Sequence, residues 1–519
     1  MKNVNVKLVS VEGGISAIGF RKIVSCARAV YPETEIYFIA TDNLYSLSSH
    51  FFAKKATLIT DYDILAIAKE LSNADVLGFS CMSASSEYVE KICREVKKIN
   101  PACFIIWGGV HPTLYPEISL ESVDCICVGE GEITITKLLQ NLIANEKIDS
   151  LPNTWVRVES QIVKNEKTEL NSSDFLSKLP LPFNDYDCKI YDSRHKSFRQ
   201  LNKFDYIHFN GLIYRTVWTL GCPFDCAYCA NDSFVFLDKG YLKLRYPSVD
   251  CIINELKNAI TINPFISTIG FYDDNLIALP MAQIEYFVSL YKEYINLPFV
   301  VFGIHPQTIN KDKIELLASA GMNRTRMGIQ SGSENTLAFY NRKTSIPKII
   351  SATTILAEAS RKHNMIMPSY DIISDNPYET LTDLIATLDL LYNLSRPYTL
   401  NIFSLRVFPK TQLFEYVKNH PIHYESLIEN SYLHTNKNLY NILLFILATL
   451  KPPKFMYRFM VKKITKEGIT KNYPLTFAII KLVYLFKRAF HHLIRFDFST
   501  IVGKWVYYVW KIKTMFKVR

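Results

Sequence analysis

Three cysteines stand close together in the segment Thr219–Cys229, separated by three and then two residues. Thiolates of this kind bind soft metals and iron–sulfur clusters. A structural zinc site requires four closed ligands, and the local segment contains no fourth Cys or His. Cys222, Cys226 and Cys229 on a [4Fe–4S] cluster would leave one iron open for a reacting ligand, and we favour this interpretation. Zinc with a distant fourth ligand and purely structural thiols remain alternatives.

The cysteine segment resembles the cluster motif of the radical S-adenosylmethionine (SAM) enzymes. The resemblance implies that the three cysteines hold the cluster and that SAM chelates the unique iron through its amino and carboxylate groups. One electron from the cluster would then cleave SAM to a 5′-deoxyadenosyl radical. The family pattern also places Tyr228, the aromatic residue before the last cysteine, near the adenine. Ordinary loop packing is the alternative role for this tyrosine.

Two later motifs match the same family and supply candidate SAM-binding residues. Asp273 and Asp274 end a predicted strand, where the family has polar groups near the SAM amino group. A carboxylate accepts hydrogen bonds from an ammonium, although Asp-Asp-Asn after a strand also caps a helix well. Gln330 and Ser331 lie in Met327–Glu334, which resembles a Gly-Ile-Glu-Ser-Gly motif. Gln330 replaces the carboxylate and would bind a ribose hydroxyl as a neutral group.

Two further elements depart from the family pattern. The segment Asp371–Thr380 resembles a strand followed by Pro-x-Glu-Thr, but the glycines expected before Pro377 are absent. In Phe408–Thr411, Lys410 stands where the family has glycine. These departures leave the shape of the substrate face open but do not affect the cluster.

Small residues end several predicted strands upstream of the cysteines. Small residues at strand ends let a planar or phosphate-bearing ligand approach the backbone in a doubly wound sheet. In this order, and upstream of the cysteines, they resemble the cobalamin-binding domain fused to radical SAM enzymes. The resemblance covers about residues 1–415. The cobalamin-binding residues that it implies are Ser80, Met82, Gly108, Gly109, His111, Gly129 and Glu130.

The loop after the first strand lacks a histidine that could ligate cobalt. Many cobalamin domains donate a histidine from the loop after the first strand, but Val11–Gly19 contains none. We therefore predict that no histidine of this loop ligates the lower cobalt face. His111 is a possible substitute, although a histidine beside proline is more often a structural turn residue. A domain that binds no corrin and only docks on its neighbour is a further alternative.

Alternation of strands and helices predicts an α/β chain with two sheet domains. Residues 1–145 alternate as expected for a doubly wound, Rossmann-like parallel sheet. Residues 146–205 look like a linker with one hairpin around Thr154–Val163. Six strand–helix units in residues 206–415 predict a partial (β/α)6 barrel with its site at the carboxyl ends of the strands. Residues 416–519 form a helical, basic, aromatic-rich region.

We expect the following strands from the apolar pattern. In the first domain they are Val4–Val11, Glu35–Ala40, Val76–Cys81, Phe104–Trp107 and Cys125–Val128. In the second they are Tyr214–Leu220, Thr268–Asp273, Phe299–Ile304, Thr325–Gln330, Ser369–Ser374 and Leu400–Phe408.

Composition excludes several classes of protein. A chain of 519 residues with 31 Tyr and 32 Phe has too much apolar surface to stay disordered. Its 11 cysteines are too sparse for a disulfide scaffold. The first residues read as a strand and not as a secretory signal. We therefore expect a cytoplasmic protein with free thiols.

The positive charge is concentrated at the carboxyl terminus. Residues 431–519 hold 17 Lys and Arg against two acidic residues, whereas the first 430 residues have a net charge of −5. The runs Pro474–Phe490 and Ile501–Phe516 are apolar and aromatic with interspersed Lys and Arg, but both are too short to span a bilayer. Such helices lie in the headgroup plane. We expect peripheral attachment to the inner face of a membrane and no nucleic-acid binding; a helical cap on the barrel is the alternative.

The combined pattern predicts a radical SAM enzyme that uses cobalamin as methyl carrier to methylate an unactivated carbon. It would need an external one-electron reductant of the flavodoxin or ferredoxin type and a small-molecule or lipid-like substrate. Radical cyclisation or rearrangement without methyl transfer is the alternative within the family. A non-catalytic, membrane-tethered iron–sulfur or corrinoid protein is the alternative of another class. A methylthiotransferase is rejected because the first domain has no second cysteine triplet. No catalytic side chain or substrate is identified.

Overall fold

The computed structural model describes residues 4–41, 59–159, 161–422, 427–428, 433–495, 497 and 505–515. The chain divides into two compact units. The first unit comprises Met1–Arg215, Asp250–Ile266 and Ser499–Arg519, and the second comprises Thr216–Val249 and Ser267–Phe498. Each unit has its own sheet.

The sheet of the first unit has nine strands in the order β7-β6-β5-β4-β3-β1-β2-β8-β9. Strands β5, β4, β3, β1, β2 and β8 run parallel to their neighbours, and the outer strands are antiparallel. The strands are β1 (Val6–Glu12), β2 (Glu35–Ala40), β3 (Val76–Cys81), β4 (Phe104–Gly109), β5 (Cys125–Cys127), β6 (Thr154–Val158), β7 (Gln161–Lys164), β8 (Lys189–Asp192) and β9 (Ser197–Gln200).

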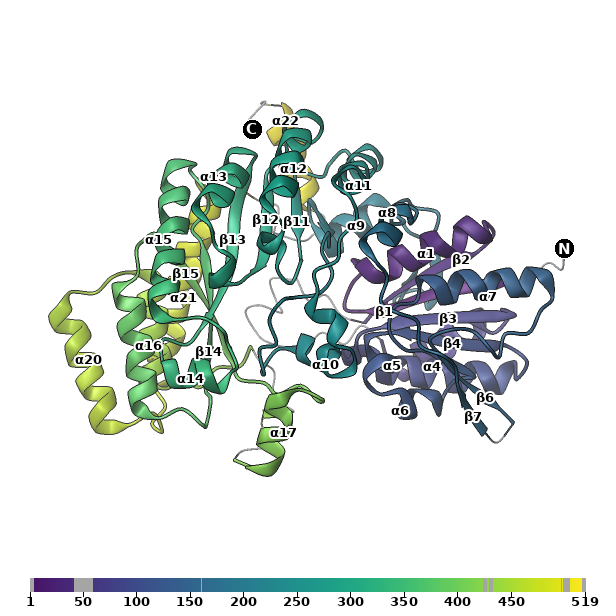
Figure 1. Cartoon of the computed structure of the whole chain (residues 1–519), viewed down its shortest axis with the longest axis horizontal. Helices are drawn as coiled ribbons and strands as arrows, with labels where there is room; N and C mark the ends of the chain where they lie inside the picture. The colour runs from purple at the N-terminus through teal and green to yellow at the C-terminus, as the bar shows by residue number, and fades with distance from the viewer. Residues whose placement is uncertain are drawn as a thin grey trace. The chain divides into compact units, whose positions relative to one another are not determined.

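Both faces of this sheet are covered by helices. Helices α1 and α7 lie on one face and α4, α5 and α6 on the other (Figure 1). The helices and turns are α1 (Ile18–Val30), α3 (Asp61–Leu71), η1 (Ser83–Ser85), α4 (Ser86–Ile99), α5 (Val110–Leu114), α6 (Pro116–Leu120), α7 (Glu132–Ala144), α8 (Ser173–Lys178), α9 (Lys203–Asn210), α11 (Val249–Ile262) and α22 (Trp505–Met515).

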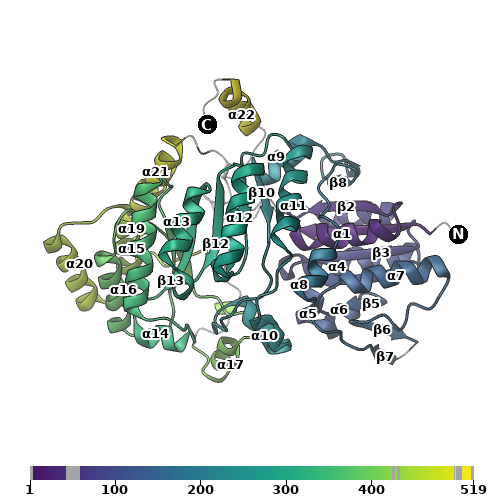
Figure 2. The same cartoon turned by 45° about the horizontal axis from the view of Figure 1, so that its top comes forward.

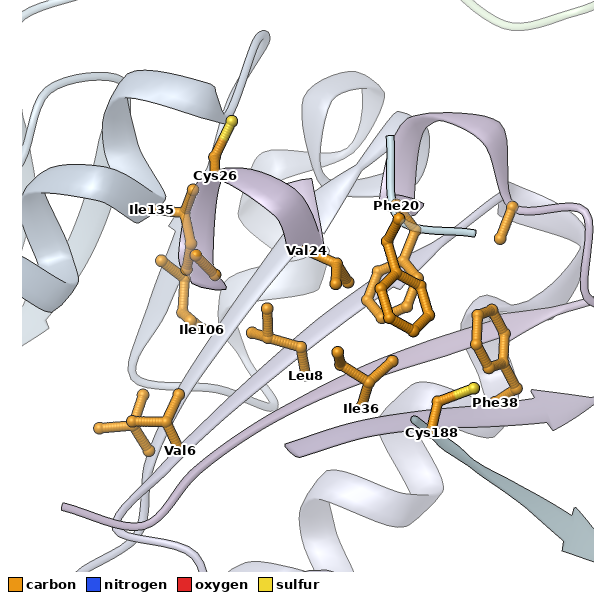
Figure 3. Packing of buried hydrophobic residues seen from close by; sticks show 14 of the residues in the cluster. Val6, Leu8, Phe20, Val24, Cys26, Ile36, Phe38, Ile106, Ile135 and Cys188 are labelled. Carbon is orange, nitrogen blue, oxygen red and sulfur yellow. The ribbon is translucent and has the colours of Figure 1, made fainter. Parts of the chain in front are cut away.

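The apolar pattern of β1 explains why both faces are buried. Successive side chains of a strand point to opposite faces. Leu8 packs with Phe20 and Val24 of α1 in one core (Figure 3), whereas Val9 packs with residues of α3 and α4 in the other. This is the doubly wound arrangement predicted from the nearly continuous apolar strands.

Residues 146–205 do more than link two domains. The expected hairpin is present as β6 and β7, and it extends the sheet beyond β5. A second hairpin, β8–β9, extends the opposite edge beyond β2. The two hairpins form hydrogen bonds with backbone groups of β5 and β2 that would otherwise be unpaired.

The second sheet has six strands in the order β10-β11-β12-β13-β14-β15. Strands β11 to β15 belong to the second unit, and β10 spans the point where the chain passes from the first unit to the second. From β11 onwards each strand pairs in parallel with the next, which confirms the predicted partial barrel. The strands are β10 (Ile213–Thr216), β11 (Thr268–Phe271), β12 (Phe299–Ile304), β13 (Met322–Gln330), β14 (Ser369–Ser374) and β15 (Thr399–Ser404).

Helices follow the strands and cover the outside of this sheet (Figures 1 and 2). The helices and turns of this unit are α10 (Ala230–Leu237), η2 (Lys239–Leu242), η3 (Leu276–Ala278), α12 (Met281–Tyr294), η4 (Pro306–Thr308), α13 (Lys311–Ser319), α14 (Glu334–Phe339), α15 (Ile346–Lys362), α16 (Leu381–Asn393), α17 (Gln412–Asn419), α19 (Leu439–Thr449), α20 (Lys454–Glu467) and α21 (Pro474–Leu493). Helix α19 packs on β15 and α16, and α21 packs on α19.

The carboxyl-terminal region is helical, as predicted. The run Pro474–Phe490 lies within α21, which continues to Leu493. The run Ile501–Phe516 coincides in part with α22, but residues 501–504 and 516 lie outside the described residues. Among the helices that the structure describes, none combines the length and apolarity needed to cross a membrane.

Candidate cluster and cofactor sites

The cysteine segment leaves β10 and is fixed first at Gly221. This glycine has a φ of +89°, and a Cβ placed there would lie 2.4 Å from the Lys243 carbonyl oxygen. The Cys222 amide then donates to the Tyr241 carbonyl at 3.0 Å. Because a side chain cannot fit between the two backbone segments, glycine is required immediately before the first cysteine.

The residues that follow α14 hold the other end of the segment. The Ala227 amide donates to the Tyr340 carbonyl at 2.9 Å, and Asn341 donates to the Asp225 carbonyl at 3.0 Å. Lys343 forms a 2.8 Å ion pair with Asp225. The segment is therefore held from both sides, by backbone contacts at Gly221 and Cys222 and by backbone and side-chain contacts at Asp225 and Ala227.

Arg342 brings a positive charge to these thiols. Its side chain is buried, and Nη1 lies 3.6 Å from Cys226 Sγ and 2.7 Å from Tyr228 Oη. Nη2 donates to the Gly328 carbonyl. A guanidinium in this position favours the negative charge of a bound cluster.

The donor set fits an iron–sulfur cluster. Cys222 and Cys229 are partly exposed, Cys226 is buried, and all three are free thiols. Burial raises the pKa of both Cys222 and Cys229 to about 12, so iron binding must supply the charge that deprotonates them. Across the described ranges no group of three His, Cys, Asp or Glu is placed to hold a single metal ion. In a [4Fe–4S] cluster each of the three thiolates binds a different iron.

The two predicted carboxylates have different surroundings. Asp273 is buried, and its Oδ1 accepts from the Trp218 amide at 3.1 Å and from the Thr219 hydroxyl at 2.7 Å. Burial raises the pKa of Asp273 to about 6, and its Oδ2 has no partner among the described residues. Asp274 is exposed and interacts with Asn231. Asp273 therefore anchors the start of the cysteine segment, and Asp274 is open to a ligand.

His305 was not predicted, although it lies at the carboxyl end of β12. Its ring stacks on Phe224 of the cysteine segment, with 3.7 Å between ring centroids. Nδ1 accepts from the Gln307 amide at 3.2 Å, which leaves Nε2 as the donor, and Nε2 has no partner in the described part of the chain. Burial and the nearby Arg342 lower the pKa of His305 to about 2. Its position at a strand end was the signal that could have identified it.

The remaining predicted SAM-binding residues lie in the same unit, and two of them, Ser331 and Tyr228, contact other protein side chains. Gln330 is buried with a φ of +75°, an unfavourable conformation of the kind that clusters at functional sites. The Ser331 hydroxyl donates to Glu379 Oε1 at 3.3 Å. Tyr228 packs edge-to-face on Tyr340 at 5.1 Å. Their roles toward SAM stay predictions.

The first unit brings several predicted cobalamin-binding residues to one edge of its sheet. The order β2-β1-β3-β4-β5 reverses direction between β1 and β3, where doubly wound sheets bind ligands. Ser80 pairs with Gly108, and Cys81 pairs with Gly109. Gly109 has a φ of +100°, and a Cβ there would lie 3.0 Å from the Cys81 carbonyl oxygen. This strand end is therefore compatible only with glycine.

The other predicted cobalamin-binding residues differ in their exposure and in their contacts. Met82 is 50% exposed, and the space around Gly129 is open, which fits a ligand lying over these strand ends. Glu130 accepts from the Asn171 amide at 2.6 Å. His111 is buried between the rings of Trp107 and Tyr115. Its role toward cobalt stays a prediction.

Sequence reasoning missed two polar groups at this edge. The Ser10 hydroxyl is buried and has no partner among the described residues. Glu12 ends β1, and burial raises its pKa to about 7. An unpaired hydroxyl and a readily protonated carboxyl at a ligand-binding edge fit a large polar ligand such as a corrin.

Comparison with known proteins agrees with both sites. The B12 binding domain family matches residues 52–139, and the radical SAM superfamily matches residues 216–391. The chain thus belongs to the radical SAM enzymes that carry a B12-binding domain. This membership implies a [4Fe–4S] cluster, SAM and cobalamin as cofactors.

Two curated relatives cover much of the chain. One is an uncharacterized methyltransferase, PH0819, of Pyrococcus horikoshii, which is 24% identical over 69% of this chain and 72% of its own length. The other is an anaerobic magnesium-protoporphyrin IX monomethyl ester cyclase of Rubrivivax gelatinosus, 22% identical over 62% of this chain and 54% of its own length.

Solved structures share the fold. The cobalamin-dependent SAM radical enzyme OxsB aligns with a TM-score of 0.62 at 15% identity, covering 99% of this chain and 84% of OxsB. The methyltransferase TsrM from Kitasatospora setae, solved with cobalamin and a [4Fe–4S] cluster, aligns with a TM-score of 0.60 at 14% identity, covering 80% of this chain and 78% of TsrM.

Proposed function

We propose that this protein is a cobalamin-dependent radical SAM methyltransferase that methylates an unactivated carbon. The observation that carries the proposal is the set of three free, rigidly held thiols beside Arg342, in a chain that also has a B12-binding domain. A relative named as a methyltransferase, aligned over most of both chains, supports methyl transfer.

The residues of the second unit have distinct roles in this proposal. When bound, the cluster supplies the electron that cleaves SAM, and cobalamin supplies the methyl group. Cys222, Cys226 and Cys229 hold the cluster. Asp274, which is exposed, accepts hydrogen bonds from the SAM amino group. Asp273 positions the cysteine segment through Trp218 and Thr219.

His305 and Arg342 act as fixed hydrogen-bond donors. His305 stays neutral, because its pKa is far below the physiological range, so its Nε2–H donates without adding charge. Arg342 remains a cation and donates toward Cys226. Donors that are already oriented lose little freedom when a negatively charged group binds.

In the first unit, the small residues at the carboxyl ends of the strands form the cobalamin-binding surface. Ser80, Gly108 and Gly109 allow close approach of the ligand to the backbone, and Met82 and Gly129 border it. Glu130 and His111 complete the predicted set. The proposal has no residue of Val11–Gly19 as cobalt ligand, because that segment contains no histidine.

A radical cyclase or rearranging enzyme is the second candidate, and the similarity to the Rubrivivax cyclase favours it. Methyl-labelled SAM separates the two. A methyltransferase transfers the labelled methyl group to the product and forms S-adenosylhomocysteine together with 5′-deoxyadenosine. A cyclase forms 5′-deoxyadenosine and labelled methionine, but no S-adenosylhomocysteine and no labelled product.

Anaerobically reconstituted protein with SAM and a reductant tests the proposal. We expect 5′-deoxyadenosine from the wild type and none from the variant Cys222→Ser/Cys226→Ser/Cys229→Ser. Cys251→Ser is the matched control, because Cys251 is also partly exposed but lies outside the motif. Absence of 5′-deoxyadenosine in the wild type would refute the enzymatic function.

The partners form a further part of the proposal. A small-molecule substrate is in keeping with the enzyme class. We propose in addition that the substrate is lipid-like, that a flavodoxin- or ferredoxin-type protein supplies the electron, and that the enzyme works in the cytoplasm at the inner face of a membrane. The basic, aromatic residues 431–519 support membrane contact.

A further inference from the structure

Helix α21 presents an apolar face to the solvent. Its exposed large side chains fall on one side of the helix, and the only polar residue exposed in the helix is Thr476. Leu475 and Phe486 are 74% and 72% exposed. The large apolar residues of this face, which we call the α21 stripe, are Leu475, Ile479, Leu482, Val483, Phe486, Phe490 and Leu493.

Three polar residues of α21 face the protein instead. Arg488 donates to Asn401 of β15 at 3.0 Å, and the Tyr484 hydroxyl donates to the Leu400 carbonyl. Lys487 donates to the carbonyls of Ala448 and Thr449 at the end of α19. Strand β15 is the edge of its sheet, so its polar groups attract the donors of α21. The apolar side is thereby turned outward.

This arrangement reverses the usual pattern of a surface helix, in which the apolar side packs inward. A helix of this length is about 30 Å long, so the α21 stripe is a large continuous apolar patch. Patches of this kind mark surfaces that bind a partner or a membrane. The stripe therefore requires an occupant that is itself apolar.

Helix α20, which precedes α21 in the chain, adds positive charge. Lys454, Arg458 and Lys462 stand four residues apart on one side of the helix, which we call the α20 basic row. Like charges at this spacing destabilise a helix, and within the described residues none of the three forms an ion pair. The row therefore does not serve the stability of α20, and it is available to bind an anion.

The α20 basic row borders a pocket of about 980 Å³. Asp389 of α16 also lines this pocket, but its Oδ1 already accepts from the Tyr457 hydroxyl at 2.7 Å. On the adjoining side of α20, Phe455 and Phe459 are 73% and 69% exposed. Basic side chains next to exposed aromatic rings match the headgroup and acyl layers of a bilayer.

We propose that α20 and α21 dock the enzyme on a membrane of anionic phospholipids. The α21 stripe enters the acyl boundary, and the α20 basic row binds headgroup phosphates. A second copy of the chain is a poorer occupant, because residues 431–519 carry a net charge of +15 and two such surfaces repel one another. The proposal specifies the membrane partner of the proposed function.

Flotation of the full-length holoenzyme with lipid vesicles tests the docking. We expect the protein to float with vesicles that contain phosphatidylglycerol, and to bind neutral phosphatidylcholine vesicles at least about tenfold more weakly. The double variant Leu482→Glu/Phe486→Glu places two charges in the stripe and should lower vesicle binding by roughly tenfold or more. Leu65→Glu, at a 53% exposed position of α3, is the matched control and should bind like the wild type.

A second variant separates the charge from the apolar stripe. Lys454→Gln/Arg458→Gln/Lys462→Gln should reduce binding to anionic vesicles to the level of neutral ones. Equal flotation of wild type and stripe variant would overturn the proposal. A lipid-free dimer that Leu482→Glu/Phe486→Glu converts to a monomer, without vesicle binding by the wild type, would also overturn it and identify a second copy as the occupant.

The outcome for docking is independent of the outcome for catalysis. Formation of 5′-deoxyadenosine without vesicle binding would refute the docking and leave the enzymatic function standing. Vesicle binding without 5′-deoxyadenosine would refute the enzymatic function and leave the docking standing.

Discussion

At the scale of single residues, the cluster site depends on side chains from distant parts of the second unit. The cysteines were predictable because their chemistry depends on local spacing. Arg342 was not, because only the folded barrel brings it to the cysteine segment. His305 follows a predicted strand end, but its stacking on Phe224 forms only in the folded protein. The roles of Asp273 and Asp274 were also beyond the sequence, which does not show that one carboxylate is buried and the other exposed.

Arg342 should set the reduction potential of the cluster. Removing its charge in Arg342→Gln should make the midpoint potential more negative by on the order of tens of millivolts. Arg342→Lys, which keeps the charge, should restore most of the difference. A redox titration followed by EPR measures this shift. Lys343→Gln is the control, because Lys343 is 59% exposed; a shift of equal size there would show that Arg342 has no special role.

Glu379 should make the second unit less stable as the pH rises. Burial raises the pKa of Glu379 from 4.5 to about 7, so the folded state binds its proton more tightly than the unfolded state. Its contribution to stability is present below pH 4.5 and is lost as the pH rises toward 7. The difference amounts to as much as about 3 kcal/mol.

The variant Glu379→Gln isolates this effect. Thermal unfolding of both proteins between pH 5 and pH 8 should show a smaller loss of melting temperature in the variant. Both proteins share every other titrating group, so the comparison removes their contributions. Identical pH profiles would show that Glu379 has an ordinary pKa in the folded protein.

At the scale of secondary structure, apolar periodicity predicted most strands but not the role of every segment. Strands β2, β3, β12 and β14 have the predicted bounds. Strand β15 ends at Ser404, not at Phe408 as predicted, because Leu405 and Val407 pack in a separate core with α17. Hydrophobicity alone does not distinguish a strand from a buried loop. The edge hairpin β6–β7 was predicted, but the second hairpin, β8–β9, was obscured by its polar composition.

The turn at Gly221 should be essential to cluster binding. In Gly221→Ala the new Cβ would collide with the Lys243 carbonyl oxygen, and the cysteine segment would have to move away from η2. We expect a reconstituted variant with a severalfold lower iron content per chain. Gly19→Ala, where nothing lies within 4 Å, is the control; equal iron content in both variants would show that the segment adapts to the methyl group.

At the scale of the whole molecule, two units with separate sheets and cores predict that the cofactors bind independently. The triple variant Cys222→Ser/Cys226→Ser/Cys229→Ser should lose iron but retain hydroxocobalamin through gel filtration. Gly109→Ala should lose most of its hydroxocobalamin, because the new side chain would press on Cys81, but should retain iron. Absorption spectra and iron analysis of the two proteins test this, and loss of both cofactors in either variant would contradict it.

The attachment of α21 to β15 restricts how the enzyme can meet a lipid. Tyr484 and Arg488 attach the helix along the sheet edge. Because this attachment is not a flexible linker, the barrel would keep one orientation relative to a membrane that binds α21. With α21 lying in the headgroup plane, β15 would lie one helix diameter, ~10 Å, from that plane. A long-chain molecule would then be modified at a depth fixed by the fold, with part of its hydrocarbon still immersed in the leaflet.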